Sequence, residues 1–200
     1  MNIFQYGQKE IDYLKKRDKI LGIAIDEIGI IKREVIPDLF TALIRNIVGQ
    51  QISSKAASTV WNRIQEHLTE VTPETIVKAT SEEIQQCGIS TRKVNYIKGV
   101  AQAVVQGELN LSELHTLPDD EVIKRLSSLK GIGVWTAEML LIFSMQRPDV
   151  VSWGDLAIRR GMMTLYGLES LTKEQFEEYW KRYSPYSSVA SLYLWAISKE

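Results

Sequence analysis

Residues 129–137 read Leu-Lys-Gly-Ile-Gly-Val-Trp-Thr-Ala, and an aspartate follows at position 155. A single residue separates Gly131 from Gly133, and one helical pattern ends and another begins at this point. Glycine readily takes positive φ and lets another backbone come close. The first N–H groups of the new helix have no partner inside it and lie at the positive end of its dipole. The stretch therefore predicts a turn that can hold a phosphate, although a glycine cap between two ordinary helices also explains it.

Positive charge is concentrated around this turn. Between residues 124 and 160 there are six basic and three acidic side chains, which gives +3, whereas the whole chain carries −1. A total so close to neutral argues against a protein that coats nucleic acid by charge alone. The local excess is compatible with a phosphate site, or simply with a solvated face.

Nearly every periodic segment predicts helix. We expect helices at Lys9 to about Ile20, from Pro37, from Ser53, from Thr72, from Thr80, and over 91–106, 118–127, 132–144, 155–166, 172–182 and 187–198. No convincing alternating strand run is present, which predicts an all-α fold. Short connections predict antiparallel neighbours in a compact helical bundle, and we expect two lobes with a cleft between them. We expect a single domain over 1–200, with lobe one at about 36–115 and lobe two at about 1–35 plus 116–200.

The cysteine and histidine counts limit the chemistry. Cys87 is the only cysteine, which excludes an intramolecular disulfide and a four-cysteine iron–sulfur cluster. We expect no transition metal, because His67 and His115 are far apart in the sequence. No apolar run approaches the ~18 residues of a membrane span, and the first residues lack the pattern of a signal peptide. We therefore expect no membrane association.

Three blocks of the sequence resemble one known family. They are residues 43–53 (Leu-Ile-Arg-Asn-Ile-Val-Gly-Gln-Gln-Ile-Ser), residues 129–155, and residues 180–195 with Tyr-Ser-Pro-Tyr-Ser-Ser at 183–188. The segment from Ser127 to Asp155 resembles the glycine hairpin and distal aspartate of the helix-hairpin-helix DNA glycosylase superfamily. Together the blocks resemble its 3-methyladenine DNA glycosylase II, or alkylbase glycosylase, branch, over roughly residues 36–198.

The resemblance implies an enzyme of base excision repair. Such an enzyme flips an alkylated purine of the 3-methyladenine type out of DNA and hydrolyses its N-glycosidic bond, leaving an abasic site. The resemblance also implies that Asp155 is the catalytic carboxylate. The transition state is oxocarbenium-like, and an anion ~4 Å away at an effective dielectric of ~20 stabilises it by about 4 kcal/mol. Asp155 could also activate the attacking water, and it can cap the helix that follows.

Trp135 and three other residues form the expected base pocket. Bifunctional relatives have a lysine at the position of Trp135, and an indole cannot form their Schiff base, so we expect a monofunctional enzyme. The resemblance implies that Trp135 and Trp195 line the pocket, with Trp153 at its border and Met139 where some relatives carry an aromatic residue. An aromatic face attracts a positively charged purine by about 0.5–2 kcal/mol. Core packing explains these aromatics as well. We expect Asp155 and Trp135 to line a common hollow.

The expected DNA contacts come from the hairpin and from a second turn. Lys130, Gly131, Gly133 and Thr136 are expected at the DNA backbone. Arg92-Lys93 could be a second, weaker phosphate contact, or simply a solvated helix start. Gln50 and Gln51 resemble the family's wedge segment, and Gln51 is the candidate that fills the gap left by the flipped base. An exposed helix start explains these glutamines equally. The resemblance also implies that the backbone carbonyls of Ser127, Leu129 and Ile132 bind a monovalent cation, Na⁺ or K⁺. We expect no other cofactor.

Two alternatives stay open: a non-catalytic helix-hairpin-helix DNA-binding module, and a glycosylase for a different damaged base. The expected partner is double-stranded DNA with damaged bases, and the chain is expected to be a monomer. It is expected in the cytoplasm with the nucleoid in a bacterium or archaeon, and in the nucleus in a eukaryote. The mixed α/β lobe that relatives often carry at the N-terminus is expected to be absent and dispensable.

Overall fold

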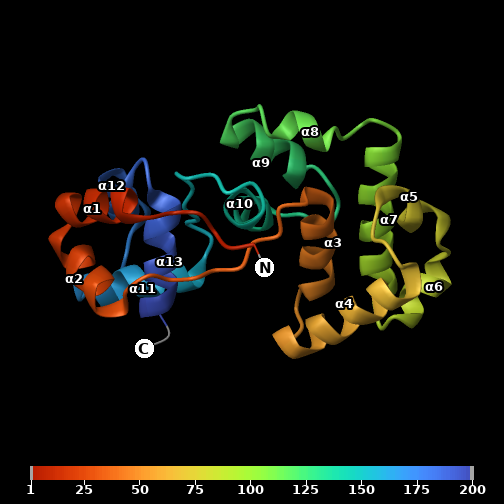
Figure 1. The fold of residues 1–200 in the computed structure, drawn as a ribbon, viewed down its shortest axis with the longest axis horizontal. Coiled ribbons are helices and arrows are strands. Elements are labelled where there is room, and N and C mark those ends of the chain that lie inside the picture. Colours follow the sequence, from red (N-terminus) through yellow and green to blue (C-terminus); the bar gives the residue numbers. More distant parts are fainter. Residues whose placement is uncertain (1, 199–200) are drawn as a thin grey trace. The chain divides into compact units, whose positions relative to one another are not determined.

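The computed structural model describes residues 2–198, and over that range its regular structure is α-helical with no strand (Figure 1). An isolated bridge pairs Ile3 with Glu34. The all-α class predicted from the sequence is therefore confirmed. None of the helices described is long and apolar enough to cross a bilayer. The chain divides into two compact units: Ile36–Leu140, here called the central unit, and Met1–Val35 with Leu141–Glu200, here called the terminal unit.

The central unit is built around its longest helices. It contains α3 (Leu39–Gly49), α4 (Ser54–Leu68), α5 (Pro73–Lys78), α6 (Ser81–Gln86), α7 (Thr91–Val105), α8 (Leu111–Leu114) and α9 (Asp119–Ser127). Helices α3, α5 and α6 pack on α7, and α4 packs on α3. The apolar stripe of α3 is fully buried, and the facing side chains of α4 and α7 complete the core: Leu43, Ile44, Ile47, Ile64, Val94 and Ile97.

Hydroxyl caps begin three of these helices where the sequence placed them. The side chains of Ser53, Thr72 and Thr80 accept N–H groups from the first turns of α4, α5 and α6. Each cap satisfies one of the donors that a helix start leaves without an internal partner. These three predicted helix starts are confirmed.

The terminal unit contains α1 (Gln8–Arg17), α2 (Lys19–Ile28), α11 (Leu156–Tyr166), α12 (Lys173–Tyr183) and α13 (Ser187–Ile197). Helices α2, α11 and α13 pack on one another, and α12 packs on α1 and α13. The single helix predicted from Lys9 to about Ile20 is wrong. Asp18 is extended, ends α1, and accepts the N–H groups of Ile20 and Leu21 to begin α2.

Helix α10 (Val134–Phe143) begins in the central unit, and its last three residues belong to the terminal unit. Its side chains are apolar on nearly every face. A helix of this kind is normally buried, and the residues Ala137, Met139, Leu140, Leu141 and Ile142 are indeed buried.

Residues 116–140 lie in the central unit, whereas the sequence placed them with the chain ends. Two contacts explain the difference. The Gln50 side-chain amide donates to the Gly131 carbonyl at 2.7 Å, and Gly131 lies against the ring of Tyr96 on α7. The hairpin is thus attached to α3 and α7 by contacts that helical periodicity does not encode.

Candidate active site

The hairpin between α9 and α10 is held by local hydrogen bonds and by one glycine. The Leu129 amide donates to the Leu126 carbonyl at 3.1 Å, and the Ile132 amide donates to the Leu129 carbonyl at 3.1 Å. Gly131 has φ +90°, and a Cβ there would lie 2.3 Å from Cδ2 of Tyr96. Both the backbone conformation and the packing therefore require glycine at this position.

Gly133 has a different surrounding. It is not among the glycines with positive φ, and a Cβ placed on it would meet nothing within 4 Å. Lys130 and Gly133 are exposed, whereas Thr136 is buried. The start of α10 is thus open beside a basic side chain, which is the arrangement that phosphate binding at a helix N-terminus needs.

The two glutamines of the candidate wedge have separate roles in the structure. Gln50 ends α3 and is tied to the hairpin through its bond to Gly131. Gln51 is exposed, and its backbone has φ +57°, a conformation that non-glycine residues rarely adopt. The blocks 43–53 and 129–137 therefore meet at Gln50, and the exposed Gln51 follows it.

A cavity of about 370 Å³ in the central unit joins these two blocks. It is lined by Ile36, Arg45, Asn46, Gly49, Gln50, Gln51, Trp135 and Thr136. Trp135 is 46% exposed. The sequence analysis missed Arg45 and Asn46; their position one helical turn before Gly49 and Gln50 was the signal that places them on the same face of α3.

Asp155 is the N-cap of α11 in the terminal unit. Its Oδ1 accepts the N–H groups of Ala157 and Ile158, both at 2.9 Å, and the residue is 7% exposed. The capping role foreseen from the sequence is confirmed. The cap fixes the carboxylate in one orientation at the positive end of the helix dipole. Asp155 and Trp135 belong to different units, and the prediction that they line one hollow stays a prediction.

The other aromatic candidates pack within the terminal unit. Trp153 meets the ring of Phe176 edge-on at 5.2 Å between centroids, and the guanidinium of Arg159 lies 4.8 Å from the centroid of Trp153. Trp195 is partly buried and lies 5.2 Å from Phe143, centroid to centroid. Met139, on α10, is 6% exposed. Packing of this kind accounts for Trp153 and Trp195 at least in part, as the sequence analysis allowed.

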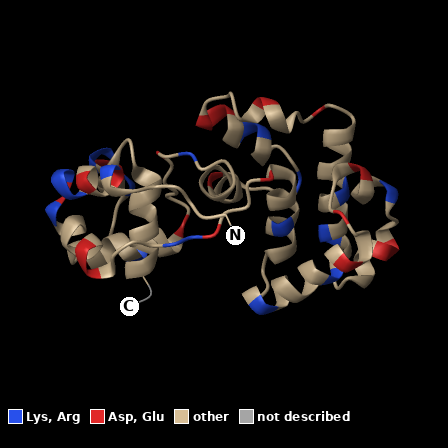
Figure 2. Cartoon of the chain, viewed as in Figure 1, with Lys and Arg blue, Asp and Glu red and all other residues tan. Residues whose placement is uncertain are grey.

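Lys93 makes contacts within the protein that the sequence did not predict, and its expected phosphate contact stays a prediction. Its amine donates to the Val48 carbonyl at 2.8 Å and to the Gln50 carbonyl at 2.6 Å. Burial, with the charge of Arg92 as the second cause, lowers the pKa of Lys93. Arg92 is exposed. In Figure 2 the ribbon is coloured for Lys and Arg on α3, at the start of α4 and along α7.

Helices α9 and α10, joined by the glycine turn, form a helix-hairpin-helix in an all-helical fold. The chain belongs to the HhH-GPD superfamily of base excision DNA repair proteins, whose sequence profile matches residues 44–185.

Particular relatives narrow the class. The chain is 39% identical to DNA-3-methyladenine glycosylase 1 of Schizosaccharomyces pombe over 165 residues, which cover 80% of this chain and 72% of that protein. The crystal structure of a DNA-3-methyladenine glycosidase from Bacillus halodurans matches with a TM-score of 0.88 and 35% identity, covering 99% of this chain and 93% of that one. The Schizosaccharomyces pombe 3-methyladenine DNA glycosylase bound to abasic DNA matches with a TM-score of 0.82 and 33% identity, covering 96% and 98%.

Proposed function

We propose that this chain is a monofunctional DNA glycosylase that removes alkylated purines of the 3-methyladenine type from double-stranded DNA and leaves an abasic site. The observation that carries the proposal is the combination of family membership with relatives and structural neighbours named as 3-methyladenine glycosylases. Trp135 stands where a lyase needs an amine, so the reaction ends at hydrolysis of the N-glycosidic bond.

Asp155 supplies the anion for this reaction. Positive charge develops on the sugar as the bond to the base breaks. Two backbone N–H groups fix the orientation of the carboxylate. The carboxylate therefore needs little reorganisation when positive charge develops on the sugar. An attraction of about 4 kcal/mol corresponds to about three decades of rate. The same carboxylate also orients the attacking water.

The DNA is held from the central unit. The open start of α10 at Gly133, with Lys130 beside it, takes a backbone phosphate. Gln51 enters the gap that the flipped base leaves, and Trp135 stacks on a base in the cavity. A monovalent cation on the carbonyls of Ser127, Leu129 and Ile132 would stiffen the hairpin. The Leu129 carbonyl accepts the Ile132 amide and keeps a second lone pair for such an ion. The chain acts as a monomer.

A panel of duplex oligonucleotides, each with one defined lesion, tests the proposal. The lesions are 3-methyladenine, 7-methylguanine, hypoxanthine and 8-oxoguanine, and the readouts are free base and strand cleavage with and without alkali. We expect release of the alkylated purines and strand cleavage only after alkali. Cleavage without alkali would contradict monofunctional chemistry. Binding without release of any base would identify a non-catalytic DNA-binding module.

A further inference from the structure

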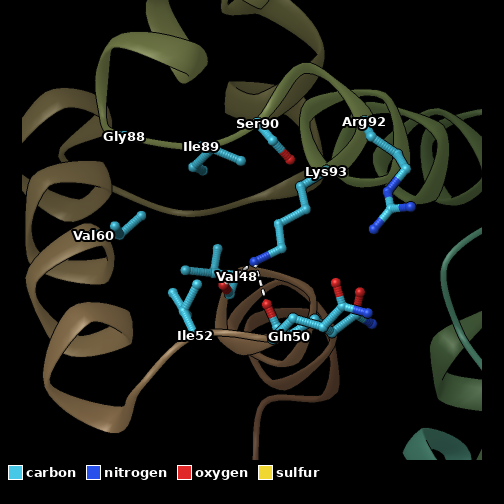
Figure 3. Close-up of a pocket in the computed structure, with 10 residues that line it drawn as sticks. Val48, Gln50, Ile52, Val60, Gly88, Ile89, Ser90, Arg92 and Lys93 are labelled. Atoms are coloured by element: carbon cyan, nitrogen blue, oxygen red, sulfur yellow. Dashed lines mark hydrogen bonds between the residues drawn. The ribbon is translucent and has the colours of Figure 1, made fainter.

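The amine of Lys93 closes the C-terminal end of α3. It reaches from the first turn of α7 and donates to the carbonyls of Val48 and Gln50 at 2.8 and 2.6 Å (Figure 3). The last carbonyls of a helix have no partner inside it and lie at the negative end of its dipole. Lys93 therefore satisfies acceptors that would otherwise be left to solvent. It also fixes the chain where α3 ends and the turn at Gln50 and Gln51, here called the wedge turn, begins.

Gln50 is held from two sides. Its backbone carbonyl accepts the Lys93 amine, and its side-chain amide donates to the Gly131 carbonyl at 2.7 Å. The residue that follows, Gln51, has φ +57°. Such a conformation is unfavourable for a residue with a side chain and persists only where the surroundings determine it. The bonds to Lys93 and Gly131 fix the residue directly before it, Gln50.

Helix α7 supports the hairpin from the same face. Tyr96 lies one turn after Lys93, and its ring lies against Gly131. Residues three apart on a helix are neighbours on its surface. One face of α7 thus contacts both turns: Lys93 bonds the wedge turn at Gln50, and Tyr96 packs against the hairpin at Gly131.

We propose that Lys93 is a positioning residue that holds Gln51 ready to enter the DNA duplex before any base has left it. This inference rests on the proposed function, because it concerns the step in which the damaged base is flipped. Lys93 does not touch the base or the reacting bond. It removes the need to order the turn when DNA binds, and ordering of this kind otherwise weakens binding.

Lys98 provides a matched control on the same helix. Its amine caps the end of α5 in the same manner, donating to the carbonyls of Ile76 and Ala79 at 3.3 and 2.5 Å. Neither acceptor lines the cavity of the wedge turn. Lys93→Met and Lys98→Met each remove one amine and keep a stem of similar length. We therefore expect similar effects on the free energy of unfolding, whereas only Lys93 bonds the residue before Gln51.

The experiment compares two duplexes that carry the same lesion. In one the lesion is paired normally; in the other it lies opposite an abasic-site analogue, where little unpairing is needed. We expect the wedge turn to keep its insertion-ready conformation in only about one Lys93→Met molecule in ten. Base release from the paired duplex then slows about tenfold. On the unpaired duplex we expect Lys93→Met to slow base release less than twofold. For Lys98→Met the ratio of the release rates on the two duplexes should equal that of the wild type. A 2-aminopurine beside the lesion should show a smaller fluorescence rise on binding Lys93→Met than on binding the wild type.

A second comparison tests the route through Gln51. In a Gln51→Ala background, Lys93→Met should cause no further loss on the paired duplex, because the wedge is already removed. An equal loss on both duplexes, no loss on either, or a full loss that persists with Gln51→Ala would overturn the proposal. If Lys93→Met does not fold, Lys93→Gln is used instead, because its shorter, uncharged side chain ends before the position of the amine, and the same difference between the two duplexes is expected. Failure of the proposed function looks different, since the wild type would then release no base from either duplex.

Discussion

Gly161 of α11 lies directly against the backbone carbonyl of Leu194 on α13: a Cβ on the glycine would be 2.0 Å from that oxygen. The two helices can approach this closely because the glycine has no side chain. Asp155 caps α11, and Trp195 follows Leu194 on α13. The glycine therefore sets the spacing between the helices that carry the candidate catalytic acid and one of the candidate pocket aromatics.

Gly161→Ala should lower the free energy of unfolding by about 3 kcal/mol, at the upper end for overpacking, because the obstacle is backbone and cannot rotate away. Urea denaturation measures the change. Gly99→Ala is the control: Gly99 is exposed within α7 with nothing within 4 Å of its Cβ. That change should raise stability by about 0.5–1 kcal/mol through helix propensity. An unchanged midpoint for Gly161→Ala would mean that α11 and α13 can separate without cost.

Gly131→Ala and Gly133→Ala should separate folding from DNA binding. The first forces an alanine into φ +90° and into the ring of Tyr96, so we expect a loss of stability of about 2 kcal/mol or more. The second meets open space, so stability should stay within about 0.5 kcal/mol.

A methyl at Gly133 should nevertheless obstruct the phosphate and weaken binding to abasic-site DNA about tenfold, or about 1.4 kcal/mol. Thermal unfolding and fluorescence anisotropy measure the two effects. Full DNA affinity in Gly133→Ala would place the phosphate elsewhere.

Asp155→Asn should abolish most catalysis and preserve the fold. Asparagine caps a helix about as well as aspartate, so the unfolding free energy should change by less than about 0.5 kcal/mol. The loss of the charge should slow base release about a thousandfold, with binding to abasic-site DNA retained. Single-turnover release from methylated DNA is the measurement. A release rate like that of the wild type would remove Asp155 from the mechanism.

Trp135→Ala should impair base recognition with little effect on stability. The residue is 46% exposed, so truncation should change the unfolding free energy by about 1 kcal/mol or less. Release of 3-methyladenine, which is cationic, should fall more than release of neutral hypoxanthine because the cation–π attraction is lost. Trp61→Ala is the contrasting change. Trp61 is 5% exposed, and its removal should cost about 3–5 kcal/mol. Equal losses for the two bases would show that Trp135 does not sense charge.

Four helix starts followed from local chemistry. Ser53, Thr72, Thr80 and Asp155 each begin a helix because a short polar side chain can bond its first N–H groups, and this needs only the residues next to it. The same local chemistry was overlooked at Asp18, where the periodicity of apolar residues suggested continuity and the cap began a new helix.

Local pattern, then, determined the all-α class, the glycine hairpin and the caps, and the motif blocks indicated the family. The tertiary structure decided which partners distant side chains take. Lys93, a candidate phosphate contact in the sequence, binds the end of α3. Gly131 is required by Tyr96 as much as by its own φ, and residues 116–140 join the central unit. The physical reason is range: a cap or a turn depends on the next few residues, whereas a lysine amine or a missing Cβ acquires its role from whatever the fold brings against it.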